Sequence, residues 1–154
     1  MKILRVILGN HLFPISQINL SKDVPIFMAE DSGLCSYIKH HKSKIALFFS
    51  AMRSYRDQLK NNSYKVIYND ANNYFSTSYF EKLFDVVKSN KIKKIEIYEI
   101  EDKPFEKDFL EFCETNNIEI SFLPSPMFID SRGEFKYFLG DKKFHLQANY
   151  YKQM

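Results

Sequence analysis

The fold is decided by a stretch that runs from Val24 to Lys60 and reads VPIFMAEDSGLCSYIKHHKSKIALFFSAMRSYRDQLK. Its first part, Val24 to Ala29, is a short apolar run, which is typical of a buried strand. The polar residues and glycine of Glu30 to Gly33 end that strand. Apolar residues and one histidine then recur at alternating steps of three and four, a pattern that predicts one face of a helix of about six turns. Its positions are Ile38, His41, Ile45, Phe48, Met52, Tyr55 and Leu59.

The same alternation of strand and helix continues on both sides of this stretch. Further short strands are predicted at Ile3 to Leu8, Tyr64 to Tyr68, Lys93 to Ile100 and Ile118 to Leu123. Helices are predicted around Phe80 to Val87 and from Pro104 to Asn116, and Pro104 suits an early helical position. We therefore predict an α/β fold with an open, mostly parallel, five-stranded Rossmann-like sheet flanked by helices.

Composition agrees with one domain of this kind. The chain has 154 residues, 45% of them hydrophobic and 27% charged, which excludes wholesale disorder. The absence of any long apolar run predicts no membrane span, and a net charge of +3 is too small to indicate nucleic-acid binding. Two separated cysteines, Cys35 and Cys113, favour reduced thiols and a cytoplasmic location, and no Cys/His cluster predicts zinc.

We assign residues 1–125 to the α/β domain and residues 126–154 to the start of a linker toward a further domain. The second segment carries a predicted short helix from Ser131 to Leu139 and an aromatic, basic tail from Phe144 to Met154. The tail keeps several large apolar side chains without an evident partner. It therefore predicts self-association of the isolated chain.

Ligands of open parallel sheets bind outside the carboxyl ends of the strands. The polar residues at those ends are Gly9-Asn10-His11, Glu30-Asp31-Ser32, Asn69-Asp70 and Glu99-Ile100-Glu101. In the predicted helix, Tyr37, His41 and Lys44 share a face near the same edge. The candidate binding residues are Gly9, Asn10, His11, Glu30, Tyr37, His41 and Lys44.

Together these groups suit a planar heterocycle with polar edges and a hydroxylated tail. Each also has a structural interpretation. His41 could be a core histidine, Gly9 could serve only the turn, Glu30 could bond the backbone at a helix start, and Lys44 could belong to a solvated surface. No nucleophile motif, phosphate loop or acid–base pair stands out, so no catalytic residue is assigned.

Four segments resemble the deoxyribodipyrimidine photolyase-related family, the group of iron–sulfur bacterial cryptochromes and (6-4) photolyases. The opening LRVILGNHL, Leu4 to Leu12, is similar to that family's first strand and turn. The most specific segment is Met28 to Lys60, which contains KHHKSKIALFFSAMR. Later motifs are FIDSRGEF, Phe128 to Phe135, and LQANYYKQM, Leu146 to Met154. The family commonly has Asp-Gln at the positions of Asn10 and His11.

The resemblance implies an N-terminal antenna domain, which would hold 6,7-dimethyl-8-ribityllumazine at the candidate residues above. It further implies a helical domain, absent from this chain, that carries FAD, a 4Fe-4S cluster and the DNA-lesion pocket. On this interpretation the chain harvests light for DNA repair or light sensing, has no repair activity alone and meets DNA through the parent protein. The alternative is a free-standing nucleotide- or flavin-type binding module, or a protein-interaction module, of the same α/β fold.

Overall fold

The computed structural model describes residues 2–19, 21–36, 38–74, 76–140 and 147–153. The chain divides into two compact units, Met1–Leu123 and Pro124–Met154. Each unit is described by itself below, because their relative placement is not determined.

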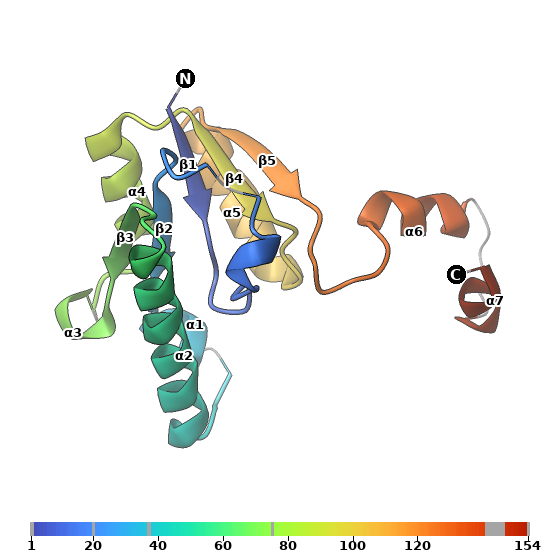
Figure 1. Cartoon of the computed structure of the whole chain (residues 1–154), viewed down its shortest axis with the longest axis horizontal. Helices are drawn as coiled ribbons and strands as arrows, with labels where there is room; N and C mark the ends of the chain where they lie inside the picture. Colours follow the sequence, from blue (N-terminus) through green and yellow to red (C-terminus); the bar gives the residue numbers. More distant parts are fainter. Residues whose placement is uncertain (1, 20, 37, 75, 141–146, 154) are drawn as a thin grey trace. The chain divides into compact units, whose positions relative to one another are not determined.

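The first unit is built on a five-stranded sheet in the order β3-β2-β1-β4-β5 (Figure 1). All four strand pairs are parallel, so the predicted open, parallel, Rossmann-like sheet is confirmed. The strands are β1 (Ile3–Val6), β2 (Ile26–Ala29), β3 (Val66–Asn69), β4 (Lys94–Tyr98) and β5 (Glu119–Leu123). The order reverses at β1, since the chain moves outward through β2 and β3 and then returns to place β4 on the other side of β1.

Helical segments connect these strands. They are the 3-10 turn η1 (Ile15–Gln17) and the helices α1 (Ser32–Ser36), α2 (Lys42–Asn61), α3 (Ala71–Tyr74), α4 (Tyr79–Asn90) and α5 (Lys103–Thr115). Local chemistry sets the starts of the last two helices. Ser78 and Glu81 form a reciprocal capping box at α4, while Asp102 caps α5 ahead of Pro104. No helix within the described ranges combines the length and apolar content needed to cross a membrane.

The long helix begins later than its periodicity predicts. His41 has extended backbone angles and acts as the N-cap of α2, because its Nδ1 accepts a hydrogen bond from the Ser43 N–H at 3.2 Å. The preceding helix α1 is separate and ends at Ser36. The prediction of one continuous helix through Ile38, His41 and Lys44 is therefore wrong. Tyr37 lies outside the described residues, so its place beside His41 and Lys44 stays a prediction. The segment from Asn69 to Ser78, predicted as a loop, contains the short helix α3.

Two apolar clusters cover the two faces of the sheet. On one face, α4 and α5 pack their buried residues, among them Leu83 and Phe109, against β1, β2 and β4. The other face is covered by α2 (Figure 1). Met52, Tyr55 and Leu59 of this helix pack against Met28 and its neighbours. Strands covered on both faces need apolar residues at nearly every position, which explains the fully buried IFMA sequence of β2.

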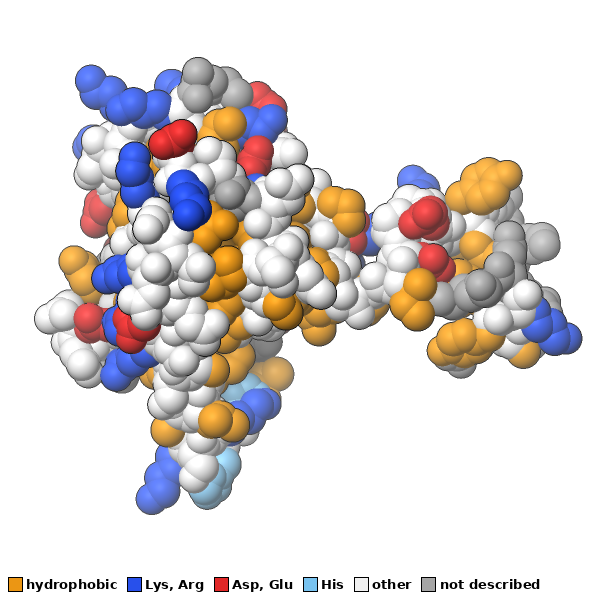
Figure 2. Space-filling model, in the orientation of Figure 1, with side chains coloured by type: hydrophobic (Ala, Val, Ile, Leu, Met, Phe, Trp, Pro, Cys, Tyr) orange, Lys and Arg blue, Asp and Glu red, His pale blue; other side chains and the backbone are white. Residues whose placement is uncertain are grey.

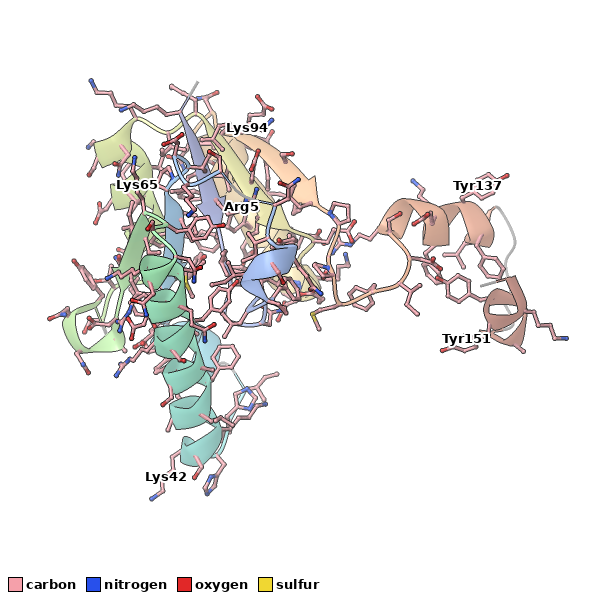
Figure 3. The ribbon with its side chains drawn as sticks, viewed as in Figure 1. Arg5, Lys42, Lys65, Lys94, Tyr137 and Tyr151 are labelled. Carbon is pink, nitrogen blue, oxygen red and sulfur yellow. The ribbon has the colours of Figure 1, made fainter. Side chains whose placement is uncertain are left out.

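The second face changes character at β1 and β4. Arg5 is buried there and donates a hydrogen bond from Nη2 to Glu96 Oε2 at 2.7 Å. Its guanidinium also lies 6.0 Å from the centre of the Tyr98 ring. Pairing of charges replaces apolar packing on this half of the face, where α2 does not reach (Figure 3).

The second unit contains α6 (Arg132–Leu139) and α7 (Gln147–Gln153). Ser131 and Glu134 form a capping box at the start of α6, in agreement with the predicted short helix. Tyr150 packs against the rings of Phe135 and Phe138 and donates a hydrogen bond to Asp130. Phe144 and Leu146 of the predicted aromatic tail lie outside the described residues, so self-association stays a prediction.

Replacement of Phe109 by alanine tests the core between α5 and the sheet. The side chain is fully buried and contacts the rings of Phe80 and Phe105, so its removal leaves a cavity. We expect the free energy of unfolding to fall by about 3–5 kcal/mol in urea titrations. Leu110→Ala, at an exposed position of the same helix, should cost at most about 1 kcal/mol. Equal effects of the two substitutions would contradict the assigned core.

Candidate functional site

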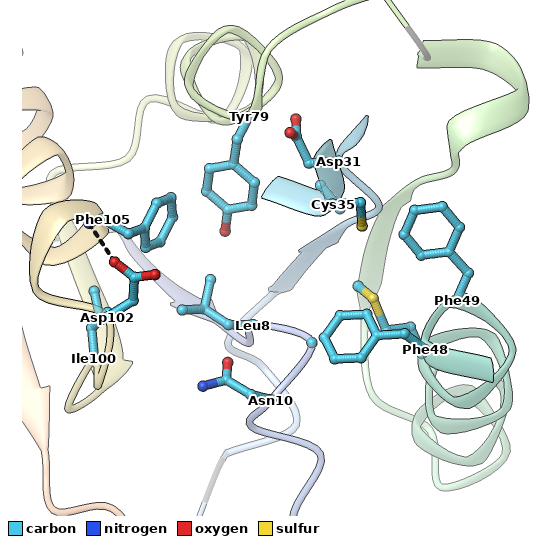
Figure 4. A pocket seen from close by; sticks show the side chains of 13 residues that line it. Leu8, Asn10, Asp31, Cys35, Phe48, Phe49, Tyr79, Ile100, Asp102 and Phe105 are labelled. Carbon is cyan, nitrogen blue, oxygen red and sulfur yellow. Dashed lines mark hydrogen bonds between the residues drawn. The ribbon is translucent and has the colours of Figure 1, made fainter. Parts of the chain in front are cut away.

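A pocket lies at the carboxyl edge of the sheet, beside the point where the strand order reverses. It has a volume of about 220 Å³ and is formed by residues after β1, β2 and β4 together with α1, α2, α4 and α5 (Figure 4). This is the position at which open parallel sheets bind ligands. The lining residues are Leu8, Gly9, Asn10, Ala29, Asp31, Cys35, Phe48, Phe49, Met52, Tyr79, Ile100, Asp102 and Phe105.

The wall on the α2 side depends on a glycine. A Cβ atom at Gly9 would lie 2.3 Å from Cε1 of Phe48, which is too close for any contact, and 3.0 Å from Sδ of Met52, which is a tight contact. The absence of a side chain at Gly9 therefore lets α2 bring its aromatic ring against the end of β1. The glycine therefore serves the close packing of the pocket wall.

Tyr79 forms part of the opposite wall. Its side chain is 5% exposed, and its ring packs edge-on against Phe27 and Phe105. The hydroxyl group is buried and has no hydrogen-bond partner among the described residues. In Figure 4 it points into the pocket. Burial, with a smaller contribution from Asp31, raises the pKa of this phenol, so the group stays protonated and able to donate.

Two carboxylates in the wall are held by their surroundings. Asp31 lies 3.3 Å from the ammonium of Lys82, a buried residue of α4 that also donates to the Glu30 carbonyl at 2.8 Å. Asp102 accepts a hydrogen bond from the Phe105 N–H at 3.0 Å (Figure 4). Both side chains are therefore fixed in place without a ligand, which keeps their oxygens at set positions along the wall.

The Cys35 thiol also lines the pocket, but it is a poor candidate nucleophile. Burial, followed by the negative charges of Asp31 and Glu30, raises the pKa of this thiol. A thiol with a raised pKa stays protonated, and the thiolate is the reactive form.

Glu30 lies outside the pocket lining and is fully buried. Arg53 of α2 donates to it from Nε at 2.6 Å and from Nη2 at 2.8 Å. The Tyr68 hydroxyl donates at 2.6 Å and the Ala71 N–H at 2.9 Å. Burial by itself would raise the pKa of the Glu30 carboxyl, but these hydrogen bonds lower it below its ordinary value. The carboxylate thus joins β2, α2, β3 and α3.

Asn10 and His11 meet at a fourth carboxylate, that of Glu101 after β4. The Asn10 amide donates to Glu101 Oε2 at 2.8 Å, and His11 Nε2 lies 3.3 Å from the same oxygen. Asn10 lines the pocket, whereas His11 is fully buried beside the rings of Phe13 and Tyr98. Burial lowers the pKa of His11 despite the opposing effect of Glu101. His11 therefore joins β1 to β4 from behind the pocket.

The remaining candidates lie apart from the pocket. His41 is exposed at the start of α2, and the Lys44 ammonium lies 3.4 Å from Nδ1 of His40. Figure 2 shows histidine and lysine side chains together at this free end of α2, near Lys42 in Figure 3. Of the predicted site residues, the structure thus brings Gly9 and Asn10 to the pocket and places the described others elsewhere.

Sequence reasoning missed most of the pocket wall. Phe48 and Met52 appear in the predicted apolar stripe of the helix, where nothing separates a core position from a pocket position. Asp102 carries a recognisable signal, because it precedes Pro104 at the end of a strand. Tyr79 has no such signal, since a tyrosine beside Ser78 fits any first turn of a helix.

Comparison with known proteins places the chain in a family. The family model described as "Deoxyribodipyrimidine photo-lyase-related protein" matches residues 5–154. The chain belongs to this photolyase-related family. A relative named "(6-4) photolyase" from Agrobacterium fabrum (strain C58 / ATCC 33970) is 30% identical over 157 residues, which is 97% of this chain and 30% of the relative's length. The chain thus spans about a third of that curated relative.

Within the described part of this photolyase-related chain, no group of three or more His, Cys, Asp or Glu side chains is placed to hold a metal ion. The polar groups at the pocket are two carboxylates, an amide, a thiol and a phenol. These groups can donate hydrogen bonds to an aromatic ligand, and accept hydrogen bonds from it, between apolar walls.

The close approach at Gly9 can be tested by Gly9→Ala. The added Cβ forces the Phe48 ring away from its position, and we expect a loss of about 1–3 kcal/mol in the free energy of unfolding. In a Phe48→Leu background the same substitution should cost clearly less, because the conflicting ring is gone. Equal costs in the two backgrounds, measured by urea unfolding, would contradict this packing role.

The Glu30 carboxylate can be tested by Glu30→Gln. Loss of the charge facing Arg53 should lower the free energy of unfolding at pH 7 by about 1.5–3 kcal/mol. Because folding lowers the pKa of Glu30, its contribution is complete above the ordinary value of 4.5 and is lost as the pH falls below it. The difference between wild type and variant should therefore shrink in that acid range. Glu111→Gln, at an exposed position, should show no such pH-dependent difference.

Proposed function

We propose that this chain is the antenna-type domain of a photolyase- or cryptochrome-like flavoprotein, in which it holds a light-harvesting chromophore. The observation that carries the proposal is the aromatic-walled pocket at the β1/β4 reversal of a photolyase-related chain. Light harvesting requires a chromophore held in a fixed position. A pocket without a catalytic constellation is compatible with that role.

The proposed chromophore is 6,7-dimethyl-8-ribityllumazine, which when bound would absorb light and pass the excitation energy to a flavin. The residues present fit such a group. Phe48, Phe49 and Tyr79 provide aromatic walls, and Asn10, Asp31 and Asp102 provide polar groups for ring edges and hydroxyls. The cavity of about 220 Å³ is smaller than the usual range of about 300–1,000 Å³ for ligand pockets, so part of a ribityllumazine would lie outside it.

The other parts of the proposal concern the whole protein. A helical domain would bind FAD, a 4Fe-4S cluster and the DNA lesion. This chain would be the partner of that domain. Cys35 and Cys113 are both free thiols, which supports a location in the reducing cytoplasm.

The rival function is a protein-interaction module of the same fold. It is favoured by the large apolar side chains exposed in the second unit, where Ile129 is 88% and Tyr137 87% exposed (Figure 3). Under that alternative the pocket would remain empty. Chromophore binding therefore separates the two functions.

The test is titration of the purified chain with 6,7-dimethyl-8-ribityllumazine, followed by the ligand's fluorescence. We expect saturable binding, and a loss of at least about tenfold in affinity in Cys35→Phe, which fills the pocket. Leu47→Phe adds similar bulk at an exposed position of α2 and should bind like wild type. Failure of the wild-type chain to bind, or equal binding by Cys35→Phe, would exclude the antenna function at this pocket.

A further inference from the structure

We infer that this pocket selects unphosphorylated ligands, and that Tyr79 fixes them by donating a hydrogen bond to a buried acceptor of the ligand. The inference rests on the proposed function, because it concerns the same pocket. It names the ligand class that the wall chemistry admits and the residue that recognises it.

The buried hydroxyl of Tyr79 is the first observation. A buried polar group without a partner is destabilising, and phenylalanine would give the same ring contacts without that cost. The hydroxyl points into the cavity (Figure 4) and has no partner among the described residues. Since the phenol stays protonated, it offers a donor. Its complement is a carbonyl oxygen or an unprotonated ring nitrogen.

The charge of the wall is the second observation. Asp31 and Asp102 line the pocket, and no lysine or arginine is found among the described lining residues. Lys82 is fully buried, and its ammonium is directed to Asp31 and the Glu30 carbonyl. A phosphate group would therefore face carboxylates without a cation to bind it.

The helix starts at the pocket give a third observation. Helix N-termini bind phosphate through free backbone N–H groups, and α4 and α5 both begin at this edge. At α4 the Ser78 side chain accepts the Glu81 N–H, while the Glu81 carboxylate accepts the Ser78 N–H. At α5 the Asp102 carboxylate accepts the Phe105 N–H. Internal caps thus occupy donors that a phosphate would use, and two of the three cap groups are themselves acidic.

The ligand class is consequently an uncharged heterocycle with a buried hydrogen-bond acceptor and a hydroxylated, unphosphorylated tail. Riboflavin and its 5′-phosphate, FMN, form a matched pair of probes, because they share the ring and the ribityl chain and differ in the phosphate. Titration of the chain with each, followed by flavin fluorescence, should show riboflavin binding at least about tenfold more tightly than FMN. Equal or tighter binding of FMN would overturn the charge selection.

Tyr79→Phe tests the recognition step. It should weaken riboflavin and lumazine binding by about two- to tenfold, while the melting temperature without ligand stays equal to or above that of wild type. Tyr74→Phe, at an exposed tyrosine, should leave binding unchanged. Unchanged binding by Tyr79→Phe, or a loss of folding stability without ligand, would overturn the assigned role, since the hydroxyl would then serve the fold.

Asp102→Asn tests the effect of the wall's negative charge without disturbing the start of α5. Asparagine is also a good N-cap, so α5 keeps its start while one negative charge is removed. The ratio of FMN to riboflavin affinity should then rise by at least about threefold. If the wild-type chain binds neither flavin nor lumazine, the proposed function fails together with this inference. If the chain binds lumazine but shows no preference for riboflavin over FMN, the inference alone fails.

Discussion

The buried carboxylate of Glu30 is the interaction on which the architecture of the first unit depends. It ends β2 and receives hydrogen bonds from α2, β3 and the first turn of α3. The backbone carbonyl of the same residue receives the buried ammonium of Lys82 from α4. A charge taken out of water is tolerable only when several donors surround it, so these elements must meet at one point. The carboxyl edge of the sheet is fixed as a result.

The pocket follows from that constraint together with the position of Gly9. Arg53 holds α2 at the end of β2, and the missing side chain at Gly9 lets Phe48 approach β1. Lys82 fixes α4, which carries Tyr79, while Asp102 starts α5 at the far wall. The charged groups therefore hold the helices in position, and aromatic side chains with a few polar atoms line the cavity. Glu30 is one of the seven predicted binding residues. Its hydrogen bonds hold the elements that carry the residues lining the cavity.

The elements could largely be predicted from the sequence because their signals are local. Apolar runs predicted the strands, and the capping residues Ser78, Asp102 and Ser131 mark helix starts that the structure has. The start of α2 could not be predicted in the same way. The apolar period continues through Ile38 and His41, yet His41 uses its ring to cap the helix, and this competing hydrogen bond is invisible to periodicity. The helix consequently starts after His41 and not before Ile38.

Sequence patterns alone indicated the fold class, the family resemblance and the edge of the sheet at which the pocket lies, because alternation, motifs and strand ends are properties of neighbouring residues. Tertiary structure alone decided which side chains face the cavity. Glu30 and Asp31 are adjacent in sequence, but consecutive residues leave a strand in opposite directions, so Glu30 pairs with Arg53 of α2 and Asp31 reaches the pocket. Tyr79 joins them from 48 positions beyond Asp31, brought there by the packing of α4 on β2. Such proximity depends on how separate elements pack, which no local pattern records.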